Sequence, residues 1–68
     1  MLLLIVEAKI SSHFEAQLWK EMDSEPEVYE IHQKHPTGVI QIKSKVNNIV
    51  YALALFDQLV EELVMTTV

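Results

Sequence analysis

Apolar residues recur at helical spacing through the last third of the chain. Between Val46 and Met65 they follow three- and four-residue intervals, and at 100° per residue they share one face. These residues are Ile49, Ala52, Leu53, Phe56, Leu59, Val60, Leu63 and Val64. The opposite arc is mostly polar, although Tyr51 and Leu55 also fall on it. The pattern predicts a long amphipathic helix that begins after a capping asparagine, either Asn47 or Asn48.

The N-terminal segment Leu2 to Lys9 is apolar on both alternating faces until Glu7. A short run of this kind is typical of a strand that is covered on both sides. We therefore predict a strand in the middle of a sheet or at a subunit interface.

A second, shorter helix is predicted from residue 13 to residue 22. Ser12 followed by Glu15 matches a capping box, so we expect the helix to begin at His13. The sequence Ser24-Glu25-Pro26 would end it. Its apolar stripe would consist of Phe14, Leu18, Trp19 and Met22.

The middle of the chain predicts a β-hairpin. Residues 27–34 alternate, with Tyr29 and Ile31 on one face, and residues 39–45 alternate, with Ile40 and Ile42 directed inward. The tetrapeptide His35-Pro36-Thr37-Gly38 between them has the residues of a tight turn.

Together these elements predict an α+β fold with the order β-α-β-β-α. We expect residues 1–68 to form one domain, a two-layer sandwich in which two helices cover one face of a three-stranded sheet. Such a sheet leaves a face and an edge uncovered, so dimerisation is expected to complete it. The residues expected to mediate self-association are Leu2, Leu3, Leu4, Ile5, Val6, Tyr51 and Leu55.

Composition narrows the classes of function. The chain has 68 residues, a net charge of −5, five lysines, no arginine and no cysteine. A chain this short gains stability from packing and oligomerisation when disulfides are excluded. Nucleic-acid binding is disfavoured, because arginine is absent and ten carboxylates outnumber the five lysines. Lys43 and Lys45, expected on one strand face, would give only a small basic patch. With no membrane-spanning run and no signal-peptide pattern, we expect a cytoplasmic protein that does not bind membranes.

One segment is strongly acidic. Five carboxylates lie between Lys20 and Lys34 without an intervening base: Glu21, Asp23, Glu25, Glu27 and Glu30. The favoured interpretation is a solvated connector, because most charge runs are hydrated surfaces. The alternative is a docking site for a basic protein partner.

Three histidines were considered as ligands or catalysts. His32 and His35 have His-x-x-His spacing, but residues three apart on a strand point to opposite faces, and zinc needs three or four convergent ligands. His13 is expected to lie in the first turn of the short helix. We expect no metal, no cofactor and no catalytic constellation.

The sequence thus predicts a small acidic, non-enzymatic protein-interaction or regulatory protein that acts as a homodimer. The alternative is a module, enzymatic or not, that binds a small ligand or a metal. Its pocket would lie between subunits and be lined by Tyr29, His32 or His35.

Overall fold

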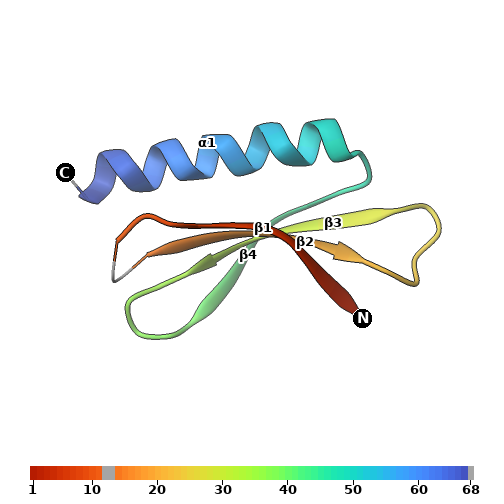
Figure 1. Ribbon diagram of the computed structural model, residues 1–68, viewed down its shortest axis with the longest axis horizontal. Coiled ribbons are helices and arrows are strands. Elements are labelled where there is room, and N and C mark those ends of the chain that lie inside the picture. Colours follow the sequence, from red (N-terminus) through yellow and green to blue (C-terminus); the bar gives the residue numbers. More distant parts are fainter. Residues whose placement is uncertain (12–13, 68) are drawn as a thin grey trace.

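The computed structural model describes residues 1–11 and 14–67, which form four strands followed by one helix. The elements are β1 (Leu2–Lys9), β2 (Glu15–Glu21), β3 (Val28–Lys34), β4 (Ile40–Val46) and α1 (Ile49–Thr67). The strands form one antiparallel sheet in the order β1-β2-β3-β4, and α1 lies across one face of it (Figure 1). The predicted β-α-β-β-α order, with three strands and two helices, is therefore wrong.

The second predicted element, residues 13–22, contains strand β2 instead of a helix. Ser12, the predicted cap, and His13, the predicted first residue of the helix, lie outside the described residues. A spacing of four residues suits one face of a helix, but because four is an even number it also suits one face of a strand. Ala16 and Leu18 lie on the same face and are fully buried, whereas Trp19 lies on the other face. Pairing with β1 and β3 on both sides gives this segment hydrogen-bond partners that an isolated short helix would lack.

Strand β1 lies at an edge of the sheet, not in its middle. It pairs only with β2, and the register shifts between Leu4 and Val6. Ile5 is thus the extra residue of a β-bulge and has no register partner on β2. One side of β1 therefore has no strand partner in the described chain. The sequence had predicted a strand in the middle of the sheet or at a subunit interface.

The predicted hairpin is confirmed as β3 and β4. The amide of Gly38 donates to the carbonyl of His35 at 2.9 Å, and Gly38 has a φ of 89°, which glycine adopts without strain. Ile40 and Ile42 are not directed inward, however. A bulge at Lys43 reverses the alternation, because the register of β4 against β3 shifts there and turns Ser44 towards the helix side instead.

The long helix is confirmed, and Asn48 is its cap. The Asn48 side-chain oxygen accepts a hydrogen bond from the Tyr51 amide at 3.0 Å, and its carbonyl accepts one from Ala52 at 2.9 Å. The core forms between α1 and the sheet, and its buried members are Ala16, Leu18, Tyr29, Ile31, Ala52, Phe56, Leu59 and Leu63.

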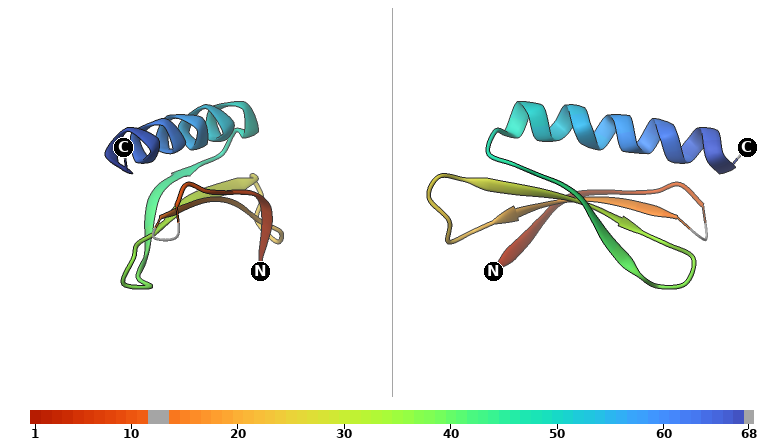
Figure 2. Two further views of the ribbon diagram at one scale, coloured as in Figure 1. Left: turned by 60° about the vertical axis from the view of Figure 1, so that its left-hand side comes forward. Right: turned by 180° about the vertical axis from the view of Figure 1, so that it is seen from behind.

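The sheet is bent. Figure 2 shows both edge strands curving away from α1, so that the face opposite the helix is concave. We call this face, centred on Gln17, Trp19, Glu30 and His32, the open face. No element of the described chain covers it.

Candidate functional site

The edge strand β1 carries a continuous apolar surface that pairs with no second strand of the described chain. Leu2, Leu3, Leu4, Ile5 and Val6 are 36–49 % exposed. They carry no charge, and the first ionisable side chain of the strand is Glu7. Five consecutive exposed apolar residues on a sheet edge make a surface that pairs with another strand unless something protects it.

The backbone of β1 also has groups without a strand partner. Met1 and Ile10, at the two ends of β1, direct backbone groups towards the residues that flank β2: the amide of Met22 donates to the carbonyl of Met1 at 2.9 Å, and the amide of Ile10 donates to the carbonyl of Phe14 at 3.1 Å. Because alternate residues of an antiparallel strand point their N–H and C=O groups to opposite sides, Leu2 and Leu4 direct theirs away from β2. This edge therefore offers donors and acceptors beside apolar side chains.

The other edge, β4, is different in charge. Ile40 and Ile42 are about half exposed there, but Lys43 and Lys45 follow them. Lys45 lies in register with Glu30 on the open face, whereas Lys43 lines a depression beside Leu55 and faces α1. The two lysines therefore do not form the joint patch that the sequence predicted. Charged side chains, lysine above all, are a common protection of a sheet edge.

The helix residues predicted to associate occupy one flank of α1. Tyr51 is exposed, and Leu55 is half-buried, packing against the core on the β4 side. The opposite flank, at 60–120° from the core line by helical geometry, carries Leu53 and Val64, which are 42 % and 45 % exposed. The sequence pattern had placed these two in the buried stripe. The exposed apolar surface of α1 therefore extends further on the flank away from β4.

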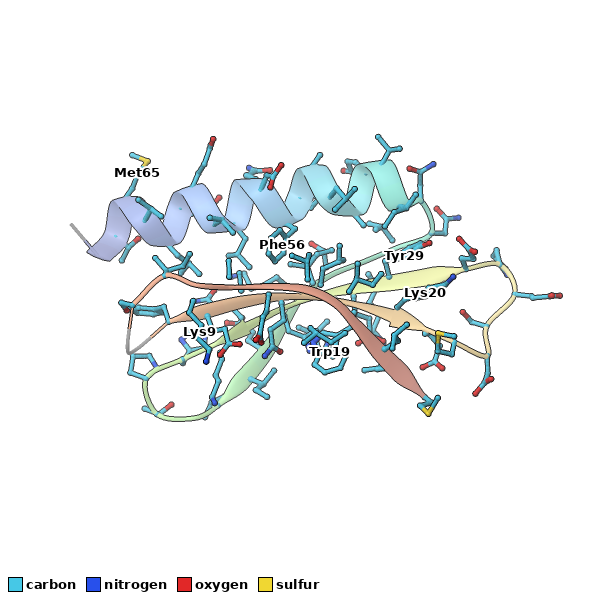
Figure 3. The ribbon with its side chains drawn as sticks, in the orientation of Figure 1. Lys9, Trp19, Lys20, Tyr29, Phe56 and Met65 are labelled. Carbon is cyan, nitrogen blue, oxygen red and sulfur yellow. The ribbon has the colours of Figure 1, made fainter. Side chains whose placement is uncertain are left out.

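The polar side chains of the open face are hydrogen-bonded to one another, and we call this group the polar floor: Glu15, Gln17, Glu30 and His32, with the Trp19 indole. The Trp19 indole donates to Gln17 at 3.0 Å, and the Gln17 amide donates to Glu15 at 3.2 Å. His32 and Glu30 are hydrogen-bonded at 2.9 Å, and the Trp19 ring lies 5.9 Å from the His32 ring, centre to centre. Figure 3 shows Trp19 on the side of the sheet away from α1, whereas Phe56 points from α1 onto the sheet.

Although no described helix or strand packs on the open face, Gln17, Glu30 and His32 are less than 10 % exposed. The concave bend and the Trp19 ring shield them. Every buried side-chain nitrogen and oxygen of the described residues has a partner. The buried side-chain polar atoms of this face are therefore hydrogen-bonded within the chain.

At one end of the open face, the carboxyl groups of Glu7 and Glu15 lie in contact. Their contact raises the pKa of Glu7 and lowers the pKa of Glu15, which Gln17 lowers further. Lys9 and Lys34 lie in register with Glu15 on either side. These two lysines and Glu15 line an open depression of about 430 Å³ together with Phe14, so two positive charges face one negative charge there.

Most of the acidic segment is engaged within the chain. Glu21 accepts a hydrogen bond from the N-terminal ammonium at 2.6 Å, and Glu27 pairs with Lys20 at 3.3 Å. Glu30 is buried on the open face against His32. Asp23 and Glu25 remain exposed in the turn between β2 and β3. Glu21, Asp23, Glu25 and Glu27 line one open depression at this end of the sheet, and of the five predicted carboxylates only Glu30 lies apart from it.

The residues of the predicted intersubunit pocket are not brought together. Tyr29 is buried under α1, whereas His32 lies on the open face. His35 lies in the hairpin turn, bonded to Gln41 at 3.0 Å and edge-on to Phe14. Within residues 1–11 and 14–67, no group of three or more His, Cys, Asp or Glu side chains is arranged to hold a metal ion.

The sequence pattern contained part of the open-face site. Alternation in residues 27–34 puts Glu30 and His32 on one face, so their proximity followed from that strand alone. Gln17 and Trp19 were missed, because their segment was predicted to be helical. Glu15, Gln17 and Trp19 recur every second residue, which is the signal that a strand interpretation would have used.

Comparison with known proteins adds no family. No protein-family model matches the chain, and no curated protein or solved structure matches it either. Among the described residues, no helix has both the length and the apolar character needed to cross a membrane.

Proposed function

We propose that this protein is a protein-interaction module that works as a homo-oligomer, and that strand β1 is the surface by which it associates. The observation that carries the proposal is the β1 edge, where Leu2 to Val6 are exposed, uncharged and consecutive. Docking of a basic partner on residues 21–30 stays a sequence-based prediction, because Glu21, Glu27 and Glu30 have partners inside the chain.

Burial of these side chains would stabilise association. Each large aliphatic side chain that becomes fully covered contributes about 1.5–3 kcal/mol relative to full exposure, and the β1 residues would gain part of that. A domain of 68 residues has a small core of its own, so intersubunit burial is a substantial addition.

Light scattering after size exclusion, over a wide dilution range, tests the proposal. We expect the mass of a dimer down to low micromolar concentrations. The test variant is Ile5→Lys, because Ile5 has no register partner on β2 and its replacement leaves the core intact. The matched control is Ile42→Lys, an isoleucine of similar exposure on the other edge.

The expected result is a monomer for Ile5→Lys and an unchanged mass for Ile42→Lys, with native circular dichroism for both. A wild-type monomer at every concentration would refute the proposal. A dimer that survives Ile5→Lys but is lost in Ile42→Lys would also refute it, because β4 would then be the associating edge.

A further inference from the structure

We infer that the partner of β1 is β1 of a second copy, paired antiparallel about a two-fold axis, so that two chains share one eight-stranded sheet. The inference rests on the proposed function and adds the geometry of the assembly. Three edge pairings are available to a sheet with two free edges: β1 with β1, β4 with β4, and β1 with β4.

Charge argues against pairing β4 with itself. Lys43 and Lys45 lie within three residues of each other on this edge, and a second copy would bring two more lysines alongside. Like charges on adjacent strands are destabilising. Glu30 on the neighbouring strand β3 lies in register with Lys45, but the Glu30 carboxylate is already hydrogen-bonded to His32.

Charge and symmetry also argue against pairing β1 with β4. The lysines of β4 would lie against a strand whose residues 2–6 carry no charge and whose single carboxylate is Glu7. Each copy would still have one unused edge, and such a head-to-tail contact continues into a filament unless it closes into a ring.

Pairing β1 with β1 removes both difficulties. It is isologous, so a dimer uses both copies of the apolar edge and leaves none for further growth. It places apolar side chains beside apolar side chains, and it gives partners to the outward N–H and C=O groups of Leu2 and Leu4. The lysine-bearing β4 strands then form the two outer edges of the dimer, where charge protects them.

The symmetry sets where the other surfaces go. A two-fold axis that relates antiparallel strands is perpendicular to the sheet, so it keeps each face on its own side. Both α1 helices therefore lie on one side of the dimer, and both open faces join on the other. Leu4 lies in register with Trp19 on the open face, so two Leu4–Trp19 pairs would flank the axis.

Cysteine cross-linking tests this geometry, since the chain has no cysteine of its own. The variants are Leu3→Cys and Ile5→Cys on β1 and Ile42→Cys on β4, all at exposed positions. Each is treated with a short bis-maleimide, alone and in equimolar mixtures, at a concentration where light scattering shows the dimer. Native circular dichroism of each variant is required before treatment.

We expect at least one β1 variant to cross-link with itself, while Ile42→Cys yields no covalent dimer alone or mixed with either β1 variant. A stable dimer in which neither β1 variant cross-links with itself overturns the inference and leaves the proposed function standing. A covalent product from the mixture of β1 and β4 variants, without self-linking of β1, assigns the β1–β4 pairing instead. A wild-type monomer overturns the inference and the proposed function together.

Discussion

Leu18 and Ile31 lie directly opposite each other on β2 and β3, and both side chains are fully buried beneath α1. They are the largest side chains of the described chain that are less than 2 % exposed. The pair joins the two central strands to the helix, so it is the centre of the core.

Truncation of either member should be costly. Leu18→Ala or Ile31→Ala is expected to lower the free energy of unfolding by about 2–5 kcal/mol, because the lost burial is accompanied by a cavity. Denaturant unfolding at one fixed protein concentration measures it, since association would make stability concentration-dependent. Val39→Ala, at an exposed position, is the control and should change stability by no more than about 0.5 kcal/mol. Equal effects at Leu18 and Val39 would contradict this account of the core.

The His32–Glu30 hydrogen bond should matter more than the His35–Gln41 one. The two bonds have similar lengths, 2.9 and 3.0 Å, but the first is buried and the second exposed. His32→Ala removes the partner of a buried carboxylate and is expected to cost about 1–3 kcal/mol. His35→Ala is the matched control, with a change of no more than about 0.5 kcal/mol. Thermal and denaturant unfolding measure both, and a larger loss for His35→Ala would contradict the assignment.

The loss of stability on substitution of Gly38 should depend on how readily the new residue adopts a positive φ. A Cβ added at this position meets no atom within 4 Å, so only backbone strain is at issue. Gly38→Ala is expected to destabilise by about 1–2 kcal/mol, because non-glycine residues disfavour the left-handed region. Gly38→Asn should cost less, since asparagine tolerates that region. Urea unfolding of the two variants gives the order, and an alanine variant as stable as wild type would show that the turn changes conformation.

The hydrogen bond between Tyr29 and Glu27 should shift the pKa values of the two groups in opposite directions. The Tyr29 hydroxyl donates to the Glu27 carboxylate at 2.7 Å, which lowers the pKa of Glu27 below 4.5, with a further contribution from Lys20. The same hydrogen bond raises the pKa of Tyr29 above 10.0. The Glu27 contribution to stability is therefore present above its unfolded pKa and lost as the pH falls through its folded pKa. The Tyr29 contribution is present below pH 10.0 and lost as the pH rises through its raised pKa.

NMR titration of the Glu27 side-chain carboxyl checks this coupling. In Tyr29→Phe the pKa of Glu27 should rise towards 4.5 but stay below it, because Lys20 remains 3.3 Å away. Lys20→Gln is the complementary variant, which should also raise the pKa of Glu27. An unchanged Glu27 pKa in Tyr29→Phe would show that the hydroxyl is not its partner.

Local patterns were sufficient for two parts of the fold. The hairpin of β3 and β4 follows from alternation and from Gly38, and α1 follows from a stripe too long to be a strand. Both signals are carried by neighbouring residues, so no distant part of the chain is needed to interpret them. The buried face of β3, with Tyr29 and Ile31, was likewise predicted correctly.

Local patterns misassigned residues 14–22 and the inward face of β4. Phe14, Leu18 and Met22 satisfy a helical and an alternating period alike, and the choice depends on whether strands are available on both sides. The inward face of β4 depends on the extra residue Lys43, since one inserted residue reverses every side chain beyond it.

By itself, the sequence determined that an apolar surplus exists near the N-terminus and that no cysteine can form a disulfide. Tertiary structure alone decided where that surplus lies, which is on an edge strand, because strand order depends on pairing between residues far apart in the chain. It also decided which carboxylates have partners within the chain. Glu30 is drawn into the open face by His32, while Glu21 is held by the N-terminus, and neither contact is visible in the charge pattern of residues 21–30.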